Sequence, residues 1–195
     1  MMKSLLLAPL FVALAAAPAA AEMDDFGKGS ITVGFQNVGA RGVNLDVEAA
    51  ANLGIFEGFA HILTPPGAFT SFFTTEAGVL FVGHTRRYLP IDLQPVMGMA
   101  FGMLMQDVAN TRGSTDTDIN LSMYMPVGLR YGFTAGGLGL QAEVAYRLSA
   151  LNSGKADLNR WHFELGGHTG KLAAAAFYEM GAVYNGPGAR IGLAF

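Results

Sequence analysis

The stretch IDLQPVMGMAFGMLMQ, residues 91–106, decides the fold class. Its odd positions carry Ile, Leu, Met and Phe with one Pro, whereas its even positions include Asp92, Gln94, Gln106, two Gly and one Ala. A repeat of two residues is the repeat of a β-strand, in which successive side chains point to opposite faces. The stretch therefore predicts a strand with one large apolar face and one small or polar face.

The same contrast recurs on both sides of the short segment TAGG, residues 134–137, in the stretches 119–133 and 138–148. Weaker alternation or strand-like composition marks the rest of the chain after residue 28. We predict ten strands of the length that a tilted strand needs to cross a bilayer, near 29–37, 43–50, 55–63, 75–84, 91–106, 119–133, 138–148, 160–168, 171–181 and 188–195. Eight strands remain the alternative, because the first hairpin or the segment 171–181 could be arranged differently.

The composition of the chain is unusual for a secreted domain. Hydrophobic residues make up 51% of it and charged residues only 14%, yet beyond the first residues the longest apolar run, VMGMAFGMLM at 96–105, is half a membrane-spanning helix. The 26 glycines are scattered through the apolar segments, where they would weaken any helix. These features argue against a helical membrane protein and favour strands.

The first 21 residues have the features of a cleaved signal peptide. Lys3 supplies the positive start, residues 5–17 form a short apolar core, and Ala19 and Ala21 have the spacing that a signal peptidase accepts. We expect a single domain at 22–195. The chain has no Cys for a disulfide or a lipid anchor. Without Lys3, 11 basic residues oppose 15 acidic ones, and this net charge of −4 argues against nucleic acid as a partner.

The two faces of the strands predict which way a barrel would be turned. The polar faces are rich in Gly and Ala and carry charges of both signs, which suits a crowded lumen, while large apolar residues suit lipid. Only a closed sheet satisfies all backbone groups within hydrocarbon. The chain is therefore predicted to be all-β, an antiparallel up-and-down transmembrane β-barrel of 8 to 10 strands.

Six charged residues on the predicted inward faces form the candidate site. We expect them to pair across the lumen as a structural network, with an ion-selective pore lining as the alternative: Arg130, Glu143, Arg147, Glu164, Glu179 and Arg190. If TAGG is a four-residue turn, Arg130 faces Gln141, Tyr124 faces Arg147, and Glu143 is diagonal to Arg130.

Connections after odd-numbered strands include the long stretches 63–73, 107–118 and 149–160, and those after even-numbered strands are short. Long loops outside and short turns inside are typical of outer-membrane barrels. The acids of DVANTRGSTDTD (107–118) could contact divalent cations that bridge lipopolysaccharide, although we favour a solvated loop. In LTPPGAFTSFF (63–73) we favour Phe69 to Phe73 as the beginning of the next strand.

The histidines are candidates for catalytic or metal-binding residues. His162, Glu164 and His168 share one inward face, and such a set could hold a metal or belong to a hydrolytic triad. Ser122 and Ser149 lie on other elements with no spacing that singles them out. We therefore favour polar lumen residues, and expect no catalytic site, metal site or cofactor. His61 and His84 carry no functional signal.

The chain closes with ARIGLAF, in which Ile191, Leu193 and Phe195 alternate with other residues. This ending resembles the C-terminal signal of bacterial outer-membrane barrels, whose final aromatic and preceding apolar residues are read by the barrel-assembly machinery. As a whole the chain resembles the small OmpA, OmpX and opacity-type barrels. The resemblance implies a monomer in the outer membrane of a Gram-negative bacterium, surrounded by lipid and lipopolysaccharide, with a structural or surface-interaction role. A narrow channel and a lipid-modifying hydrolase are the alternatives.

Overall fold

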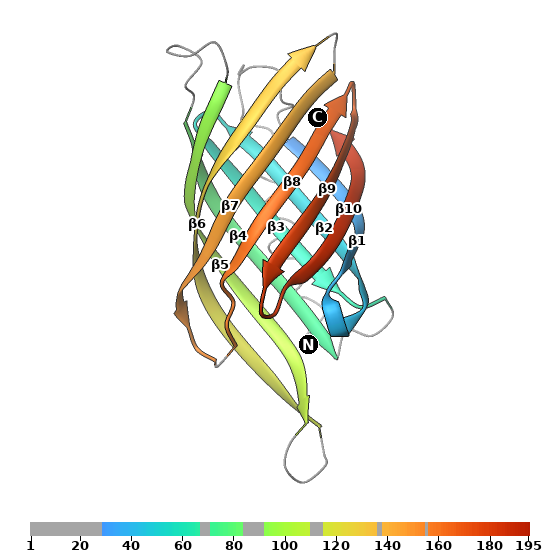
Figure 1. The fold of residues 1–195 in the computed structure, drawn as a ribbon, viewed down its shortest axis with the longest axis vertical. Helices are drawn as coiled ribbons and strands as arrows, with labels where there is room; N and C mark the ends of the chain where they lie inside the picture. The colour runs from blue at the N-terminus through green and yellow to red at the C-terminus, as the bar shows by residue number, and fades with distance from the viewer. Residues whose placement is uncertain (1–28, 67–70, 84–91, 110–114, 136–137, 155) are drawn as a thin grey trace.

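Ten antiparallel strands close into one barrel in the computed structural model (Figure 1), which describes residues 29–66, 71–83, 92–109, 115–135, 138–154 and 156–195. The strands are β1 (Gly29–Asn37), β2 (Val43–Leu53), β3 (Phe56–Thr64), β4 (Phe72–Val82), β5 (Asp92–Ala109), β6 (Thr115–Ala135), β7 (Leu138–Asn152), β8 (Arg160–Thr169), β9 (Leu172–Gly181) and β10 (Asn185–Ala194). A short 3₁₀ helix, η3 (Gly39–Arg41), follows β1. Over the described ranges, no helix has the length and apolar character required to span a membrane.

Each strand pairs with its neighbours in the chain, and β1 pairs with β10 to close the ring. The closing seam runs from Ser30 opposite Ala194 to Gln36 opposite Gly188. Beyond it, the main-chain amides of Gly29 and Phe195 each donate to the carbonyl of the other, at 2.8 and 2.9 Å. The last residue of the chain is therefore part of the closure.

The two ends of the barrel differ. One end carries the β2–β3, β6–β7 and β8–β9 connections and the end of β10, and we call it the turn end. The other carries the β1–β2, β5–β6, β7–β8 and β9–β10 connections and is called the loop end. β5 and β6 are the longest strands, with 18 and 21 residues, and their hairpin projects beyond its neighbours at the loop end (Figure 1).

The barrel has its apolar side chains outside and its polar side chains inside. The exposed residues include Val33, Phe35, Met97, Met99, Phe101, Leu121, Val127, Leu129, Val144, Leu165, Ile191 and Leu193. The buried polar residues of the inward faces include Thr32, Gln36, Asn44, Asp46, His61, Thr74, Glu76, Gln94, Asn120, Ser122, Arg160, His162, Glu179 and Arg190. This is the reverse of a water-soluble barrel, in which the apolar face is buried.

The predicted fold class is confirmed, and the described strands number ten rather than eight. Three expectations about connections were wrong. Loop 149–160 is shorter than expected, because β7 continues to Asn152. Loop 107–118 is shorter than expected, because β5 continues to Ala109 and β6 begins at Thr115. β6 extends beyond the predicted 133 to Ala135, which pairs with Leu138 at the start of β7, and this shifts the register of the two strands by two residues. Of 63–73, Phe72 and Phe73 do begin β4.

An apolar cluster fills the lumen at the loop end, where the sequence predicted only polar lining. Inward residues of β3 to β6 meet three residues from the loop-end connections, Val38, Leu158 and Tyr184, and all eight are buried: Val38, Leu63, Phe72, Ala100, Leu104, Tyr124, Leu158 and Tyr184. We call this set the loop-end cap. Three connections thus fold over the barrel mouth and cover it with side chains.

Candidate functional site in the barrel lumen

Arg130 on β6 holds two carboxylates from opposite directions. Its Nε donates to Glu143 Oε2 on the neighbouring strand at 2.8 Å, and its Nη1 and Nη2 donate to the two oxygens of Glu57 on β3 at 2.8 and 3.0 Å. β4 and β5 lie between β3 and β6, so the pair with Glu57 crosses part of the lumen. The register places Arg130 directly opposite Glu143, not opposite Gln141 as the four-residue turn had predicted.

Arg190 on β10 organises a second group of carboxylates. Its guanidinium contacts Glu48 on β2 at 2.6 Å, Glu164 on β8, and Asp46 on β2 at 3.5 Å. Asp46 in turn lies 2.8 Å from His61 Nε2 on β3. His61, which the sequence left without a role, is therefore paired inside the barrel.

An aromatic ring stacks on Arg190 because a glycine on the same strand, β10, leaves room for it. The guanidinium carbon of Arg190 lies 4.5 Å from the centre of the Phe177 ring. Phe177 is opposite Gly188, where a Cβ atom would lie only 2.2 Å from the ring carbon Cζ. Glycine at this position therefore lets the aromatic ring lie flat against the strand and support the arginine.

Arg160 on β8 is the most deeply buried of the described lumen arginines. Its side chain is 1% exposed, and Nη2 lies 2.6 Å from Glu76 on β4, whose side chain is 2% exposed. Its Nε lies 3.1 Å from Glu179 on β9. Three strands separate β4 from β8 in the ring, so the Arg160–Glu76 pair spans the lumen almost from wall to wall. The rings of Tyr124 and Tyr184 flank the guanidinium, at 5.1 and 4.1 Å.

His162 joins these groups into one network. Its Nδ1 lies 2.9 Å from Glu179 Oε1 and its Nε2 lies 3.4 Å from Glu164 Oε2. Arg147 completes the connection, at 3.4 Å from Glu76 and 3.6 Å from Glu179. Both ring nitrogens of His162 face carboxylates, which leaves neither to take a proton from a serine hydroxyl, as a hydrolytic triad requires.

We call the connected set the central network: Asp46, Glu48, His61, Glu76, Arg147, Arg160, His162, Glu164, Glu179 and Arg190. Together with the group around Arg130, it sets seven carboxylates against four guanidinium groups and two imidazoles. Among the described residues, no three His, Asp or Glu side chains are arranged to hold a metal ion.

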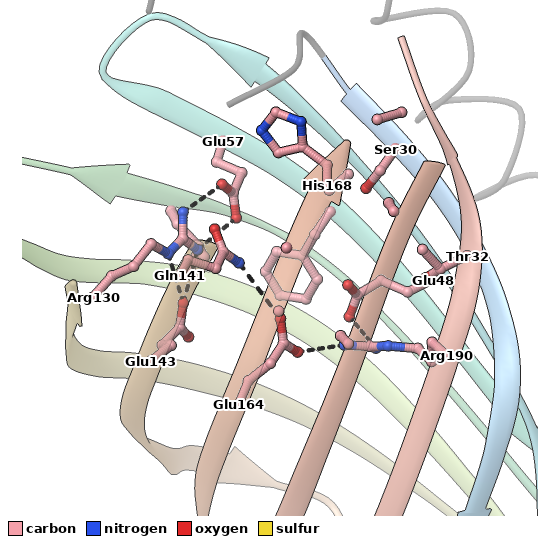
Figure 2. A pocket seen from close by; sticks show the side chains of 18 of the residues that line it. Ser30, Thr32, Glu48, Glu57, Arg130, Gln141, Glu143, Glu164, His168 and Arg190 are labelled. Atoms are coloured by element: carbon pink, nitrogen blue, oxygen red, sulfur yellow. Dashed lines mark hydrogen bonds and ion pairs between the residues drawn. The ribbon is translucent and has the colours of Figure 1, made fainter. Parts of the chain in front are cut away.

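A cavity of about 150 Å³ remains at the turn end, between the two groups of ion pairs. Figure 2 shows its lining: Arg130 is linked to Glu57 and Glu143 on one side, Arg190 is linked to Glu48 and Glu164 on the other, and Gln141 donates to Glu164 between them, with His168 and Ser30 farther along the wall. A barrel of eight strands has an interior that side chains just fill. Two further strands explain why side chains leave some space here.

The loop-end cap is held by one anchoring arginine. Arg41 of η3 donates through Nη1 to the carbonyl of Val183 at 3.1 Å and through Nη2 to Gln106 Oε1, and its guanidinium lies over the Phe72 ring at 4.6 Å. Partial burial lowers the pKa of Arg41. Burial, together with the nearby Glu76 carboxylate, raises the pKa of Tyr184 well above its usual value. Tyr184 is therefore neutral in the cap.

All six predicted lumen residues lie on the inward face and take part in these contacts. Sequence reasoning missed the other members: Asp46, Glu48, Glu57, His61, Glu76, Arg160 and His162 as ion-pair partners. Tyr124, expected opposite Arg147, lies opposite Ser149 beside an irregularity in the ladder. Ile191, Leu193 and Phe195 point outward, exposed, on the seam. The predicted signal peptide and His84 lie outside the described residues.

No protein-family model, curated protein or solved structure matches the chain. The geometry defines a closed, up-and-down, antiparallel β-barrel with an apolar exterior and a charge-paired lumen.

Proposed function

We propose that this protein is a barrel of the bacterial outer membrane with a structural or surface-interaction role, its lumen plugged by its own side chains. The loop end faces the cell exterior, and residues 1–21 direct export. Lipid and lipopolysaccharide surround a monomer, and the barrel-assembly machinery reads the last strand. The role is not enzymatic.

The exterior supports a lipid environment. Large apolar side chains are exposed on every strand from β1 to β10. Soluble monomers rarely expose contiguous apolar patches larger than a few hundred Å². A closed ring of this kind also leaves no unpaired sheet edge, which is the requirement for spanning hydrocarbon.

The plug is the observation that carries the proposed role. Two ion pairs cross the lumen: Arg160 on β8 contacts Glu76 on β4 with an N–O distance of 2.6 Å, and Arg130 on β6 contacts Glu57 on β3 at 2.8 Å. The loop-end cap covers the mouth of the barrel beyond them. An ion on its way through would have to separate pairs that are removed from water, which is costly. The surface for interaction with partners is then the loop end, where the β5–β6 hairpin projects.

Single-channel recording in a planar bilayer tests the plug. The protein is refolded in detergent and shown to be folded by its different gel mobility before and after boiling, and a known porin in the same bilayer is the positive control. We expect no conductance steps from the wild type. Discrete steps that change in size in Arg130→Ala or Glu143→Ala would contradict the plug, because the lumen would then be a water path.

The turn-end cavity favours a narrow channel as the second candidate. The cavity already hollows one part of the lumen, so a path would need only the lumen-crossing pairs and the cap to separate. A channel gated in this way predicts steps in the variant Glu76→Gln even if the wild type is silent. Silence from both folded proteins would exclude it.

A further inference from the structure

The turn-end cavity is large enough for a small molecule and too small for most drug-sized ligands. Its volume of about 150 Å³ is below the roughly 300–1,000 Å³ of typical ligand pockets, while one water needs about 10–15 Å³ on this measure. It can therefore hold several waters, or a ligand of a few heavy atoms and some water.

The charges that face the cavity from the β1–β2 side lean toward negative. Both Glu48 and its partner Arg190 line the cavity, but the Glu48 side chain is 24% exposed and that of Arg190 only 3%. Arg190 donates to Oε2 of Glu48, and among the described residues Oε1 of Glu48 accepts no hydrogen bond. In the lumen, seven carboxylates oppose four guanidinium groups and three imidazoles, those of His61, His162 and His168, so these groups sum to a negative charge whenever at least one of the imidazoles is neutral. The wall therefore offers acceptors to a cation.

An unpartnered hydroxyl lies beside this carboxylate. Thr32 on β1 is directly opposite Glu48 on β2, and both line the cavity. Thr32 is 7% exposed, and its Oγ1 has no hydrogen-bond partner. Side chains directly opposite on adjacent strands have Cβ atoms about 5 Å apart, so the hydroxyl and the carboxylate are close enough to bind one donor group.

The rest of the cavity wall includes apolar groups that a bare metal ion would not need. Phe59, Leu80, Ala50 and Ala174 line it together with the charged side chains. A ligand that matches this wall has a cationic end with hydrogen-bond donors and a short hydrocarbon body. A primary ammonium group supplies three donors and no acceptor, which fits an acceptor-rich wall.

We propose that the turn-end cavity binds a small aliphatic primary amine in its ammonium form, with Glu48 Oε1 and Thr32 Oγ1 as acceptors for its N–H groups. The site is blind, because the lumen-crossing ion pairs and the loop-end cap lie beyond it. The ligand therefore enters and leaves from the turn end. This inference rests on the barrel and its cavity, and not on the membrane in which the barrel lies.

Calorimetric titration of the full-length folded barrel with n-butylammonium chloride tests the proposal. The protein is kept in a nonionic detergent at low ionic strength, so that neither detergent charge nor salt masks a weak cation site. Sodium butyrate, of the same chain length and opposite charge, is titrated in parallel. We expect saturable heat from butylammonium and none from butyrate.

Two variants locate the site. Glu48→Gln keeps the shape and removes the charge, and we expect it to weaken binding at least about tenfold, as for loss of a hydrogen bond to a charged group. Thr32→Val removes only the hydroxyl and should weaken binding by a smaller factor, which keeps the test available if Glu48→Gln does not fold. Asp107→Asn, a carboxylate on the β5–β6 hairpin, is the matched control and should bind as the wild type does.

Four outcomes would overturn the proposal. One is the absence of saturable binding to a demonstrably folded barrel, and another is equal binding of butyrate. The third is butylammonium binding that both cavity variants leave unchanged, which would place the amine elsewhere on the protein or in the detergent. Saturable heat from magnesium chloride with none from butylammonium would likewise replace the amine by a metal ion.

Discussion

Removing Arg160 should destabilise the barrel more than removing any surface charge. In Arg160→Met, Glu76 loses its two contacts at 2.6 Å and retains only Arg147 at 3.4 Å, while Glu179 loses a contact at 3.1 Å. Glu76 is 2% exposed, so water cannot replace the lost partner. Breaking a buried pair in this way costs about 3–5 kcal/mol. With a urea slope of about 2 kcal/mol/M, the midpoint would fall by about 1.5–2.5 M.

Urea titration of the refolded barrel measures this loss through tryptophan fluorescence. The chain has a single Trp, Trp161, which lies on the exterior and stacks near Tyr146 and Phe163. The control is Lys171→Met, which removes one exposed positive charge at the β8–β9 turn and should change stability by less than about 0.5 kcal/mol. The double variant Arg160→Met with Glu76→Gln should lose less unfolding free energy than the sum of the losses of the two single variants. A cost below about 1 kcal/mol for Arg160→Met would refute a dry, tightly paired lumen.

Other consequences of the geometry can be tested separately. Gly34→Ala should cost about 1–3 kcal/mol or prevent folding, because its Cβ would lie 1.8 Å from the carbonyl oxygen of Ala189. Gly58→Ala is the control and should be tolerated, because no atom lies closer than 4.0 Å to its Cβ. Equal urea midpoints for the two variants would argue against the close approach of β1 and β10 at Gly34. Folding raises the pKa of Tyr184 above its ordinary value near 10, so above pH 10 the tyrosine ionises more readily in the unfolded chain than in the barrel. The free energy of unfolding should therefore fall as the pH rises above about 10. Tyr184→Phe should lose less stability than the wild type at such pH, and parallel pH profiles would contradict this. Phe195→Ala keeps the main-chain hydrogen bonds to Gly29 and should refold normally in detergent. If the terminal aromatic is an assembly signal, the variant should give a smaller folded fraction than the wild type in cells. Equal folded fractions in cells would contradict that role.

Alternation predicted the strands well wherever one face is uniformly large and apolar. It was obscured in β3 and β4 because their inward faces are themselves partly apolar. Phe59 points into the lumen between Glu57 and His61, and Leu63 does so beyond His61. On β4, Phe72 and Leu80 point into the lumen on either side of Glu76. These residues belong to the loop-end cap and to the cavity wall. Because both faces of such strands carry apolar residues, the two-residue alternation of apolar and polar residues cannot distinguish them from strands that are buried on both faces.

The partners within the lumen could not be predicted, because they depend on closure. Arg160 and Glu76 are 84 residues apart and lie on strands that face each other across the ring. Strand pairing in sequence order relates only neighbouring strands, which is why Arg130 and Glu143 were recognised as close and Glu57 was not. The register error at β6 and β7 has a local origin, since these strands continue two residues closer to each other than a four-residue turn allows.

Spin-label accessibility tests most directly the central claim that the apolar faces of this barrel contact lipid. The chain contains no Cys, so single cysteines can be introduced and labelled without removing others. Labels at Met99→Cys and Val127→Cys, both outward and exposed, are compared with one at Val108→Cys on the projecting hairpin. In lipid bilayers the account predicts that the first two labels collide with oxygen far more than with a water-soluble nickel complex, and that the third shows the opposite. Free access of the nickel complex to Met99→Cys and Val127→Cys would show that the apolar exterior is not in a membrane.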